Sequence, residues 1–271
     1  MAKTVILVGC GNMGYAMLSG WLSAGRLKPS DAHVVEPNAE LRGRAEALGV
    51  AASQSAAEIA QGEAPKLVVF AVKPQVMRDV VAPYRPLAEN GTAFVSIAAG
   101  TPIATFEDLL GSKAAIIRCM PNTPAAIGRG MMVTVSNAHV GQDVGDFVNG
   151  LLSASGAVTS VDDEALMDAV TAVSGSGPAY VFHFIECLTA AGEKAGLPTD
   201  TAAKLAMQTA YGATSLAAAS DDPPSRLREQ VTSPNGTTAA ALNVFMGGGR
   251  LEKLVEGAVE AARVRSVELG K

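Results

Sequence analysis

The sequence is poor in the residues that build metal centres and disulfide frameworks. Its 271 residues include three histidines and three cysteines, and the cysteines (Cys10, Cys119 and Cys187) lie far apart along the chain. Neither set has the spacing of a metal site, and an odd number of scattered cysteines does not make a disulfide framework. We therefore expect no bound metal and a reducing compartment, which favours a cytoplasmic protein.

The sequence also lacks a basic segment and a long apolar run. The formal net charge is -5, and without a basic block no nucleic-acid partner is expected. No charge-free run reaches the roughly 20 apolar residues of a membrane span, so no membrane association is expected. The apolar start of the chain is too short for a signal sequence and ends in a glycine loop at Gly9. Apolar residues are nevertheless abundant, at 48%, which predicts a packed core.

Short β-branched runs alternate with alanine-rich helical stretches through the first half of the chain. Near-continuous apolar strands between helices are typical of a parallel sheet covered on both faces. Because crossovers between parallel strands are right-handed, we expect an α/β fold with an N-terminal doubly wound, Rossmann-type sheet. The expected strands are Thr4–Val8, His33–Glu36, Leu67–Val72, Ala93–Ala98 and Ala115–Arg118, with Met131–Ser136 and Ala157–Val161 extending the sheet.

The strand signal stops after residue 161, which predicts a sheet domain of residues 1–161 and an all-helical domain of residues 162–271. Asp162 and Asp163 are expected to cap a helix that runs to about Val173. The glycines of Ser174–Gly177 are expected to break it. Asp200 is expected to cap a later helix that runs to about Ala219, and two shorter helices and a terminal one should follow.

The helix expected over Ala179–Ala195 is apolar almost all round in its first half. A helix of that pattern must be buried. Because this half of the chain has few helices, a partner subunit is the natural cover, and we expect a homo-oligomer with a dimer as its minimum unit. His183 and Glu186, on the same helix, are interpreted as core or interface residues rather than as catalysts.

The glycine loop Gly9-Cys-Gly-Asn-Met-Gly14 directly follows the first expected strand and opens a helix. Its three glycines suit a tight turn, a close approach of the backbone to a pyrophosphate, and close packing of helix on strand. The helix start then supplies N–H groups for the phosphates. Residues 1–161 are therefore the expected dinucleotide-binding domain, and Cys10 is interpreted as a small residue that fits the loop. The predicted cofactor-binding residues here are Gly9, Cys10, Gly11, Asn12, Met13 and Gly14.

An acidic residue, Glu36, ends the second expected strand, where dinucleotide-binding folds hold the adenosine ribose. Its carboxylate can accept both ribose hydroxyls and would repel the 2′-phosphate of NADPH. Arg42 and Arg44, a turn or two further on, are placed to reach such a phosphate. Glu36 is alternatively a solvated loop residue. The cofactor is therefore NADH or NADPH, and the choice stays open.

Five further stretches occur in a specific order: Ala71–Pro74, Ser96–Gly100, Met120–Pro124, Ser174–Tyr180 and Thr232–Thr238. Together with the glycine loop they resemble the pyrroline-5-carboxylate reductase family, from the first strand to the last helices. The first three stretches follow expected strands, where ligands of open α/β sheets bind. The resemblance implies a reductase that transfers a hydride from NADH or NADPH to the C=N bond of 1-pyrroline-5-carboxylate, giving L-proline in the last step of proline biosynthesis.

The resemblance also implies which residues touch the cofactor and the substrate. Thr238 is the candidate catalytic residue, as a hydrogen-bond donor to the imine nitrogen. The substrate carboxylate is expected to bind Ser233, Gly236, Thr237 and Thr238 at a helix start, which matches the way that successive N–H groups bind anions. Further cofactor-binding residues are expected at Ser55, Ala71, Val72, Lys73, Pro74, Ile97, Ala98, Ala99, Pro121 and Asn122.

The sequence departs from the family where a glutamate usually precedes the substrate loop, because Ser220 is followed there by Asp221 and Asp222. Either aspartate is a candidate for that task, or both are solvated charges. A β-hydroxyacid dehydrogenase shares the domain order, but the expected helix after Gly177 has no lysine before Lys194 and no asparagine to handle a hydroxyl proton. A dinucleotide sensor without catalysis is the second alternative.

Overall fold

The chain forms two compact units in the computed structural model, which describes residues 4–58 and 64–270. Residues 1–176 together with residues 262–271 make one, here called the sheet unit, and residues 177–261 make the other, the helical unit. The expected boundary after residue 161 lies inside the sheet unit, because residues 162–176 pack with the sheet and not with the helices. As a division by function, residues 1–161 and 162–271 stay a prediction.

The described residues of the sheet unit form a single eight-stranded sheet with the order β3-β2-β1-β4-β5-β6-β7-β8. Strands β3 to β6 are parallel and in the doubly wound order. The expected fold class is thus confirmed. The strands are β1 (Val5–Val8), β2 (Ala32–Val35), β3 (Ala51–Ser53), β4 (Leu67–Phe70), β5 (Ala93–Ser96), β6 (Ala115–Met120), β7 (Gly130–Ser136) and β8 (Gly156–Ser160).

Each of the seven expected strands is present, and β3 is the one that the sequence analysis missed. Strand β3 has three small residues and no β-branched one, so it carries no strand signal. The extension of the sheet also changes direction, because β7 runs antiparallel to β6. A short connection that contains the left-handed Gly128 joins the two strands, and antiparallel neighbours need no long crossover.

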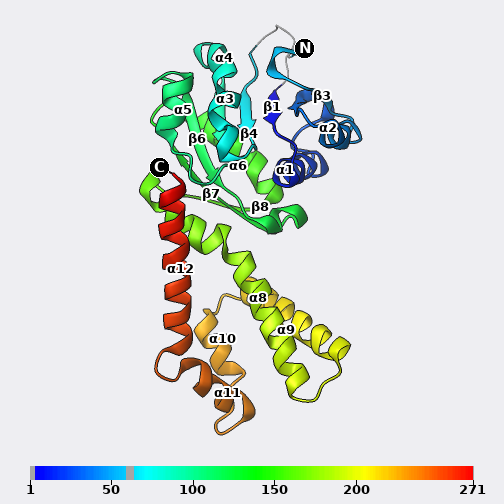
Figure 1. Cartoon of the computed structure of the whole chain (residues 1–271), viewed down its shortest axis with the longest axis vertical. Helices are drawn as coiled ribbons and strands as arrows, with labels where there is room; N and C mark the ends of the chain where they lie inside the picture. Colours follow the sequence, from blue (N-terminus) through cyan, green and yellow to red (C-terminus); the bar gives the residue numbers. More distant parts are fainter. Residues whose placement is uncertain (1–3, 59–63, 271) are drawn as a thin grey trace. The chain divides into compact units, whose positions relative to one another are not determined.

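Helices cover both faces of the sheet (Figure 1). Successive residues of β1 point to opposite faces, so that Val5 and Leu7 enter one core and Ile6 and Val8 enter the other. The first core lies under α1 (Asn12–Ser23), α2 (Ala39–Glu46) and α6 (Gln142–Leu152), and the second under α3 (Met77–Val81), α5 (Ile103–Leu110) and α7 (Met167–Val170). A short α4 (Arg85–Glu89) and several 3-10 turns complete the unit.

The segment from Asp163 to Gly175 departs from the single helix that we expected. Asp163 does act as a cap, since its side chain accepts a hydrogen bond from the N–H of Ala165 at 2.9 Å. A 3-10 turn, α7 and a π-helical turn (Thr171–Gly175) then follow in succession. The expected break at Ser174–Gly177 is confirmed, because the π turn ends at Gly175 and Ser176 separates it from the next helix. Gly175 lies close to the methyl group of the Met120 side chain.

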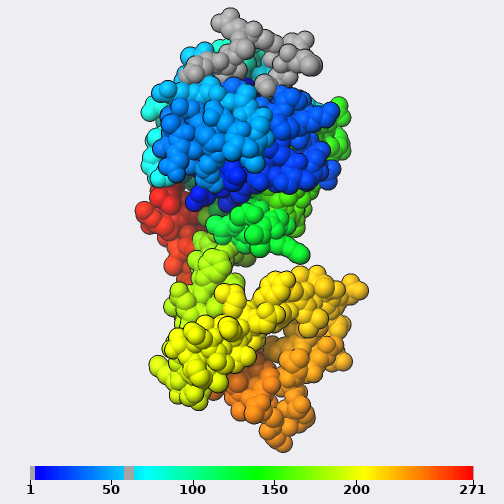
Figure 2. Space-filling view, turned by 90° about the vertical axis from the view of Figure 1, so that its right-hand side faces the viewer, coloured from blue at the N-terminus to red at the C-terminus, as the bar shows by residue number. Residues whose placement is uncertain are grey.

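The helical unit contains α8 (Gly177–Lys194), α9 (Thr199–Ala219), α10 (Pro224–Gln230), α11 (Thr237–Met246) and the start of α12 (Arg250–Leu269). Among its residues, all of which are described, the buried hydrophobic side chains are Ala202 and Ala206. The apolar α8 leaves Val181, Phe182 and Phe184 exposed, with Phe182 at 59%. The unit therefore has almost no core within one chain, and many of its large apolar side chains are exposed to solvent. Its surface is drawn in yellow to orange in Figure 2.

One capping residue in this unit was assigned wrongly. Pro198 and not Asp200 is the N-cap of α9, and no side chain makes the capping hydrogen bond there. Asp200 lies in the first turn, where its negative charge interacts favourably with the positive end of the helix dipole.

An ion pair between a buried arginine and a half-buried glutamate ties the segment after β8 to the sheet. Arg118 of β6, whose side chain is 7% exposed, contacts Glu164 at 2.9 Å. The same Glu164 oxygen accepts the N–H of Ile103 at the start of α5, at 2.9 Å. Removing the carboxylate would leave a buried guanidinium without its partner.

We expect Glu164→Ala to lower the free energy of unfolding by about 2–4 kcal/mol, because the buried Arg118 guanidinium and the N–H of Ile103 both lose their acceptor. Urea unfolding at a fixed protein concentration measures the change. Glu229→Ala, which breaks the exposed Arg226–Glu229 pair, is the matched control and should cost about 0–1 kcal/mol. Equal effects of the two substitutions would contradict the role of Glu164.

Candidate functional site

The glycine loop between β1 and α1 is shaped by three different constraints. Gly9 has a φ of +94°, and a Cβ atom there would lie 2.7 Å from the carbonyl oxygen of Ala71. A Cβ atom on Gly14 would collide with the carbonyl oxygen of Gly9. At Gly11, by contrast, a Cβ atom would meet nothing within 4 Å. Two glycines thus allow close packing of α1 on the strands, and the third leaves open space at the helix start.

Glu36 is buried, with 7% of its surface exposed, so its interpretation as a solvated loop residue is wrong. One carboxylate oxygen accepts the N–H of Cys10 at 2.8 Å, and the other accepts the N–H of Asn38 at 2.9 Å. Glu36 therefore ties the glycine loop to the turn after β2. Each carboxylate oxygen has two lone pairs, so one on each remains for a further donor.

The two arginines after β2 have different surroundings. Arg42 donates from Nη1 to the carbonyl oxygens of Glu36 and Pro37, at 2.9 and 2.7 Å. The guanidinium of Arg44 lies over the ring of Tyr15, 4.0 Å from its centre. Arg42 thus braces the turn after β2, whereas Arg44 stacks on α1 as a cation over an aromatic face.

The two cysteines of the sheet unit are buried and not reactive. Burial raises the pKa of the Cys10 thiol, the nearby Arg44 guanidinium lowers it, and the Glu36 carboxylate raises it. Burial alone raises the pKa of Cys119 to about 12. Both thiols are therefore protonated at neutral pH. Cys10 fits its interpretation as a small packing residue of the loop.

A cavity of about 560 Å³ lies at the carboxyl ends of β1, β2 and β4. It brings together seven of the predicted cofactor-binding residues: Gly9, Gly11, Glu36, Ser55, Ala71, Val72 and Lys73. Three apolar side chains that the sequence analysis did not select, Leu41, Val76 and Val80, also line it. Their only signal in the sequence is their position shortly after the ends of two strands. A mostly apolar cavity with Glu36 and Ser55 in its lining suits an adenosine.

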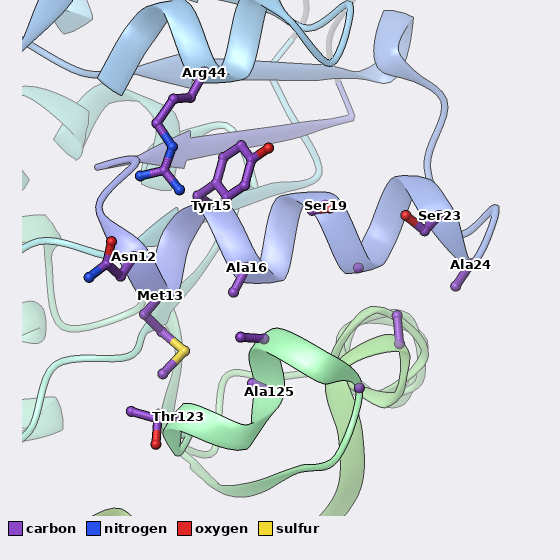
Figure 3. Close-up of a pocket in the computed structure, with 14 residues that line it drawn as sticks. Asn12, Met13, Tyr15, Ala16, Ser19, Ser23, Ala24, Arg44, Thr123 and Ala125 are labelled. Carbon is purple, nitrogen blue, oxygen red and sulfur yellow. The ribbon is translucent and has the colours of Figure 1, made fainter. Parts of the chain in front are cut away.

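A second cavity, of about 820 Å³, follows the outer side of α1. In Figure 3, Arg44 and Tyr15 lie on one side of the helix and Thr123 and Ala125 of the turn after β6 on the other. Of the predicted cofactor-binding residues, only Asn12 and Met13, at the helix start, line it in the described part of the chain. The larger cavity is thus not the one that gathers most of the predicted residues.

Eight predicted cofactor residues remain, and they lie in the glycine loop and in the loops after β4, β5 and β6. Among the described residues, Pro74, Ile97, Ala98, Ala99, Pro121, Cys10, Gly14 and Asn122 do not line either cavity. Asn122 is engaged within the protein, since its side chain donates to the carbonyl oxygen of Ser174 at 3.1 Å and accepts the N–H of Met131 at 2.8 Å. It fastens the loop after β6 to the π turn. Its contact with a cofactor stays a prediction.

In the helical unit, the predicted substrate residues form the start of α11. Gly236 is the N-cap, and no side chain makes a capping hydrogen bond to the helix. The N–H of Gly236 donates to the carbonyl oxygen of Ser233 at 3.0 Å, and Asn235 adopts a left-handed φ of 60°. This tight turn places Thr237 and Thr238 in the first helical turn, where N–H groups point out of the helix and suit an anion.

The charged groups near this turn have local partners. Asp222 accepts a hydrogen bond from the Gln230 side chain at 2.8 Å, across α10. On α8, His183 lies 2.9 Å from Glu186, and both side chains are 75% exposed within the chain. Neither pair touches the start of α11 through a hydrogen bond that the described residues show. The roles of Asp221 and Asp222 therefore remain unassigned.

Two broader properties of the described residues bear on function. In residues 4–58 and 64–270, no group of three or more histidine, cysteine, aspartate or glutamate side chains is arranged to hold a metal ion. Over the same ranges, no helix has the length and apolar character needed to cross a membrane.

Comparisons with known proteins agree along the whole chain. Residues 164–269 match the family model described as pyrroline-5-carboxylate reductase dimerisation, and residues 3–100 match the one described as NADP oxidoreductase, coenzyme F420-dependent. The pyrroline-5-carboxylate reductase of Pseudomonas aeruginosa is 43% identical over 269 residues, which cover 98% of this chain and 97% of that protein.

Solved structures show the same similarity in three dimensions. The pyrroline-5-carboxylate reductase of Coxiella burnetii superposes with a TM-score of 0.93 at 32% identity, covering 100% of both chains. The Plasmodium falciparum pyrroline carboxylate reductase, solved with NADP bound, gives a TM-score of 0.84 at 31% identity, covering 99% of this chain and 98% of that one.

Because a side chain at Gly11 would enter open space at the start of α1, a substitution there tests whether the cofactor binds at this position. We expect Gly11→Val to raise the dissociation constant for NADPH at least about tenfold, because the new side chain fills the space where a pyrophosphate approaches the helix start. Fluorescence titration with NADPH measures it. The melting temperature should change little, since Gly11 has an extended φ of -63° and ψ of -171°.

The matched control is Gly43→Ala, on the exposed side of α2, where a Cβ atom also meets nothing within 4 Å. It should leave NADPH binding unchanged. Tight binding of NADPH by the Gly11 variant would show that the pyrophosphate does not approach this loop.

Proposed function

Because the chain belongs to the pyrroline-5-carboxylate reductase family, we propose that the glycine loop with the strand ends binds its cofactor and that the start of α11 binds its substrate. The reaction is NAD(P)H-dependent hydride transfer to the C=N bond of 1-pyrroline-5-carboxylate, which gives L-proline. The alternatives of a β-hydroxyacid dehydrogenase and of a sensor without catalysis fall with this assignment.

One observation carries the proposal. Of the three described helices that begin at a glycine N-cap without a side-chain cap, α1 and α11 begin inside the glycine loop and the predicted substrate turn, at Gly11 and Gly236, whereas α6 begins at Gly141, outside both. N–H groups at such a helix start bind anions, and the missing side chain lets the anion approach. The cofactor brings a pyrophosphate and the substrate brings a carboxylate. We assign the pyrophosphate to α1, because this helix follows the strand end beside the adenosine-sized cavity. The carboxylate then belongs to α11.

The adenosine half of the cofactor fits the cavity at the ends of β1, β2 and β4. Leu41, Val76 and Val80 offer apolar contacts to the base, and Glu36 and Ser55 lie on the polar edge for the ribose. The free lone pairs of Glu36 accept ribose hydroxyls, while its charge opposes a 2′-phosphate. Arg44 lines the neighbouring cavity along α1, but its charge reaches the glycine loop at Cys10, and we assign to it the role of offsetting the charge of Glu36. NADH and NADPH are therefore both accepted, and Glu36 sets the balance between them.

This assignment predicts a change of cofactor preference. We expect Glu36→Gln to shift the ratio of kcat/KM for NADPH over NADH roughly fivefold toward NADPH, because the negative charge beside the 2′-position is removed. Steady-state assays with each cofactor and pyrroline-5-carboxylate measure the ratio.

Both absolute values should also fall, since an amide cannot accept from both Cys10 and Asn38 with the same geometry. Glu40→Gln, an exposed carboxylate in the first turn of α2, is the control and should leave the ratio unchanged. A ratio that stays constant in Glu36→Gln would mean that Glu36 only braces the loop.

The chemistry asks little of the protein beyond orientation and charge. The bound nicotinamide supplies the hydride, and a protonated imine is already electrophilic, so that neither a strong base nor a metal is required. Before hydride transfer, Thr238 donates a hydrogen bond to the nitrogen lone pair of the neutral imine and relays to it a proton supplied by the solvent, which gives the protonated imine. Ser233, Gly236 and Thr237 hold the carboxylate and so fix the imine carbon in near-attack geometry.

The role of Thr238 separates catalysis from binding. We expect Thr238→Ala to lower kcat about 100-fold, as for loss of a positioned proton donor, with an unchanged dissociation constant for NADPH. Thr238→Ser keeps the hydroxyl and should recover most of the activity. The loss of absorbance of NADPH after addition of pyrroline-5-carboxylate measures turnover.

Thr232→Ala is the control, because the Thr232 hydroxyl donates to the carbonyl oxygen of Arg228 at 2.6 Å, outside the anion-binding turn. It should be nearly as active as the unmodified chain. Full activity of Thr238→Ala would remove Thr238 from the mechanism.

We also propose a homodimer as the minimum assembly and a cytoplasmic location. The exposed apolar face of α8 and the near absence of a core in the helical unit support a partner copy, as does the match of residues 164–269 to a dimerisation model. Three free cysteines suit a reducing compartment. The net charge of -5 supports small-molecule partners and not nucleic acid.

A further inference from the structure

The last turn of the chain is fastened to the sheet unit. Helix α12 begins in the helical unit, but its residues from 262 onward belong to the sheet unit. Ser266 is 4% exposed, and its hydroxyl donates to the carboxylate of Asp168 on α7 at 2.6 Å. A hydrogen bond this short to a charged acceptor is among the stronger kinds. The chain end is therefore held at one place, next to α7.

The chain end also touches the loop after β5. Gly100 has a φ of +73°, and a Cβ atom there would lie 3.3 Å from the backbone of Leu269. In the reverse direction, a Cβ atom on Gly270 would lie 3.0 Å from the carbonyl oxygen of Gly100. Two glycine backbones thus face each other directly. Figure 1 shows the C-terminus returning to the sheet unit close to α5, which follows this loop.

The segment Glu164–Asp168 is hydrogen-bonded both to the loop after β5 and to the last turn of the chain. Glu164 accepts the N–H of Ile103, where the loop after β5 enters α5, at 2.9 Å. Asp168, four residues further along the same segment, accepts the hydroxyl of Ser266. Within the loop, the N–H of Ala98 makes only a long bond of 3.3 Å to the Ser96 side chain. Ile97 is held to β4 by its N–H bond to the carbonyl oxygen of Phe70 at 3.1 Å, so it is the position of residues 98–100 that depends on what lies against Gly100.

We propose that the last turn of the chain, residues 266–270, is a positioning element of the cofactor site. By resting on Gly100, it fixes the part of the loop that carries Ala98 and Ala99. This inference rests on the proposed function, which assigns that loop to the nicotinamide half of the cofactor. Ser266 and Asp168 act through the loop and touch no reacting atom.

The experiment compares two ligands that differ only in the nicotinamide. NADPH carries it, and 2′-phospho-ADP-ribose lacks it. We expect Ser266→Ala and Asp168→Ala each to weaken NADPH binding about three- to tenfold and to leave 2′-phospho-ADP-ribose binding unchanged. The lost hydrogen bond releases the loop after β5, which is assigned to the nicotinamide, but leaves the glycine loop in place. Asp168→Asn keeps an acceptor for the Ser266 hydroxyl and should bind both ligands normally.

Arg265→Ala is the matched control on the same helix turn. It breaks the exposed Arg265–Glu268 pair and leaves the contact with α7 in place, so both ligands should bind normally. Ala99→Val changes the loop itself and should weaken NADPH alone. Calorimetric titration of the full-length protein with both ligands, together with the melting temperature, gives all the readouts.

Each other result overturns the inference in a distinct way. If Ala99→Val weakens NADPH but Ser266→Ala and Asp168→Ala do not, the chain end has no part in the site while the loop assignment stands. If Ala99→Val has no effect either, the assignment of the loop to the nicotinamide is wrong. If the Ser266 and Asp168 variants weaken both ligands equally, the contact only stabilises the fold.

Discussion

The carboxylate of Glu36 is the interaction on which the cofactor end of the sheet depends. It joins two backbone turns that belong to different strands, the glycine loop after β1 and the turn after β2. Because the carboxylate is buried, water does not compete for these bonds, and a charged acceptor strengthens them. This carboxylate therefore fixes the position of the start of α1, and with it the open space at Gly11, relative to the cavity at the ends of the strands.

The two units of the chain are stabilised by different means. The sheet unit has a core on each face, including a cluster in which the Phe70 ring meets Tyr84 edge-on at 5.3 Å and stacks on Phe94 at 6.0 Å. The helical unit has no comparable core among its residues, and its apolar side chains remain at the surface of the single chain. The second unit therefore gains little hydrophobic stabilisation within one chain, because most of its apolar surface stays uncovered there.

Much of this architecture could be predicted from local patterns. The strands follow from β-branched runs, the site of the glycine loop from its place between β1 and α1, and the turn before α11 from its glycine. The features that escaped prediction depend on contacts between distant residues. The π turn is held by Asn122, and the bond from Ser266 to Asp168 spans 98 residues. Strand β3 has no side-chain signal, and the double role of Glu36 appears only when two turns meet.

The three cysteines differ in a way that has a practical consequence. Cys10 and Cys119 are buried with raised pKa values, whereas Cys187 is exposed on α8. A maleimide added to the folded chain will therefore attach at one position. Since Cys187 lies on the apolar helix α8, the rate of its alkylation reports whether α8 is covered. A fluorophore attached to Cys187 would report assembly in the same way.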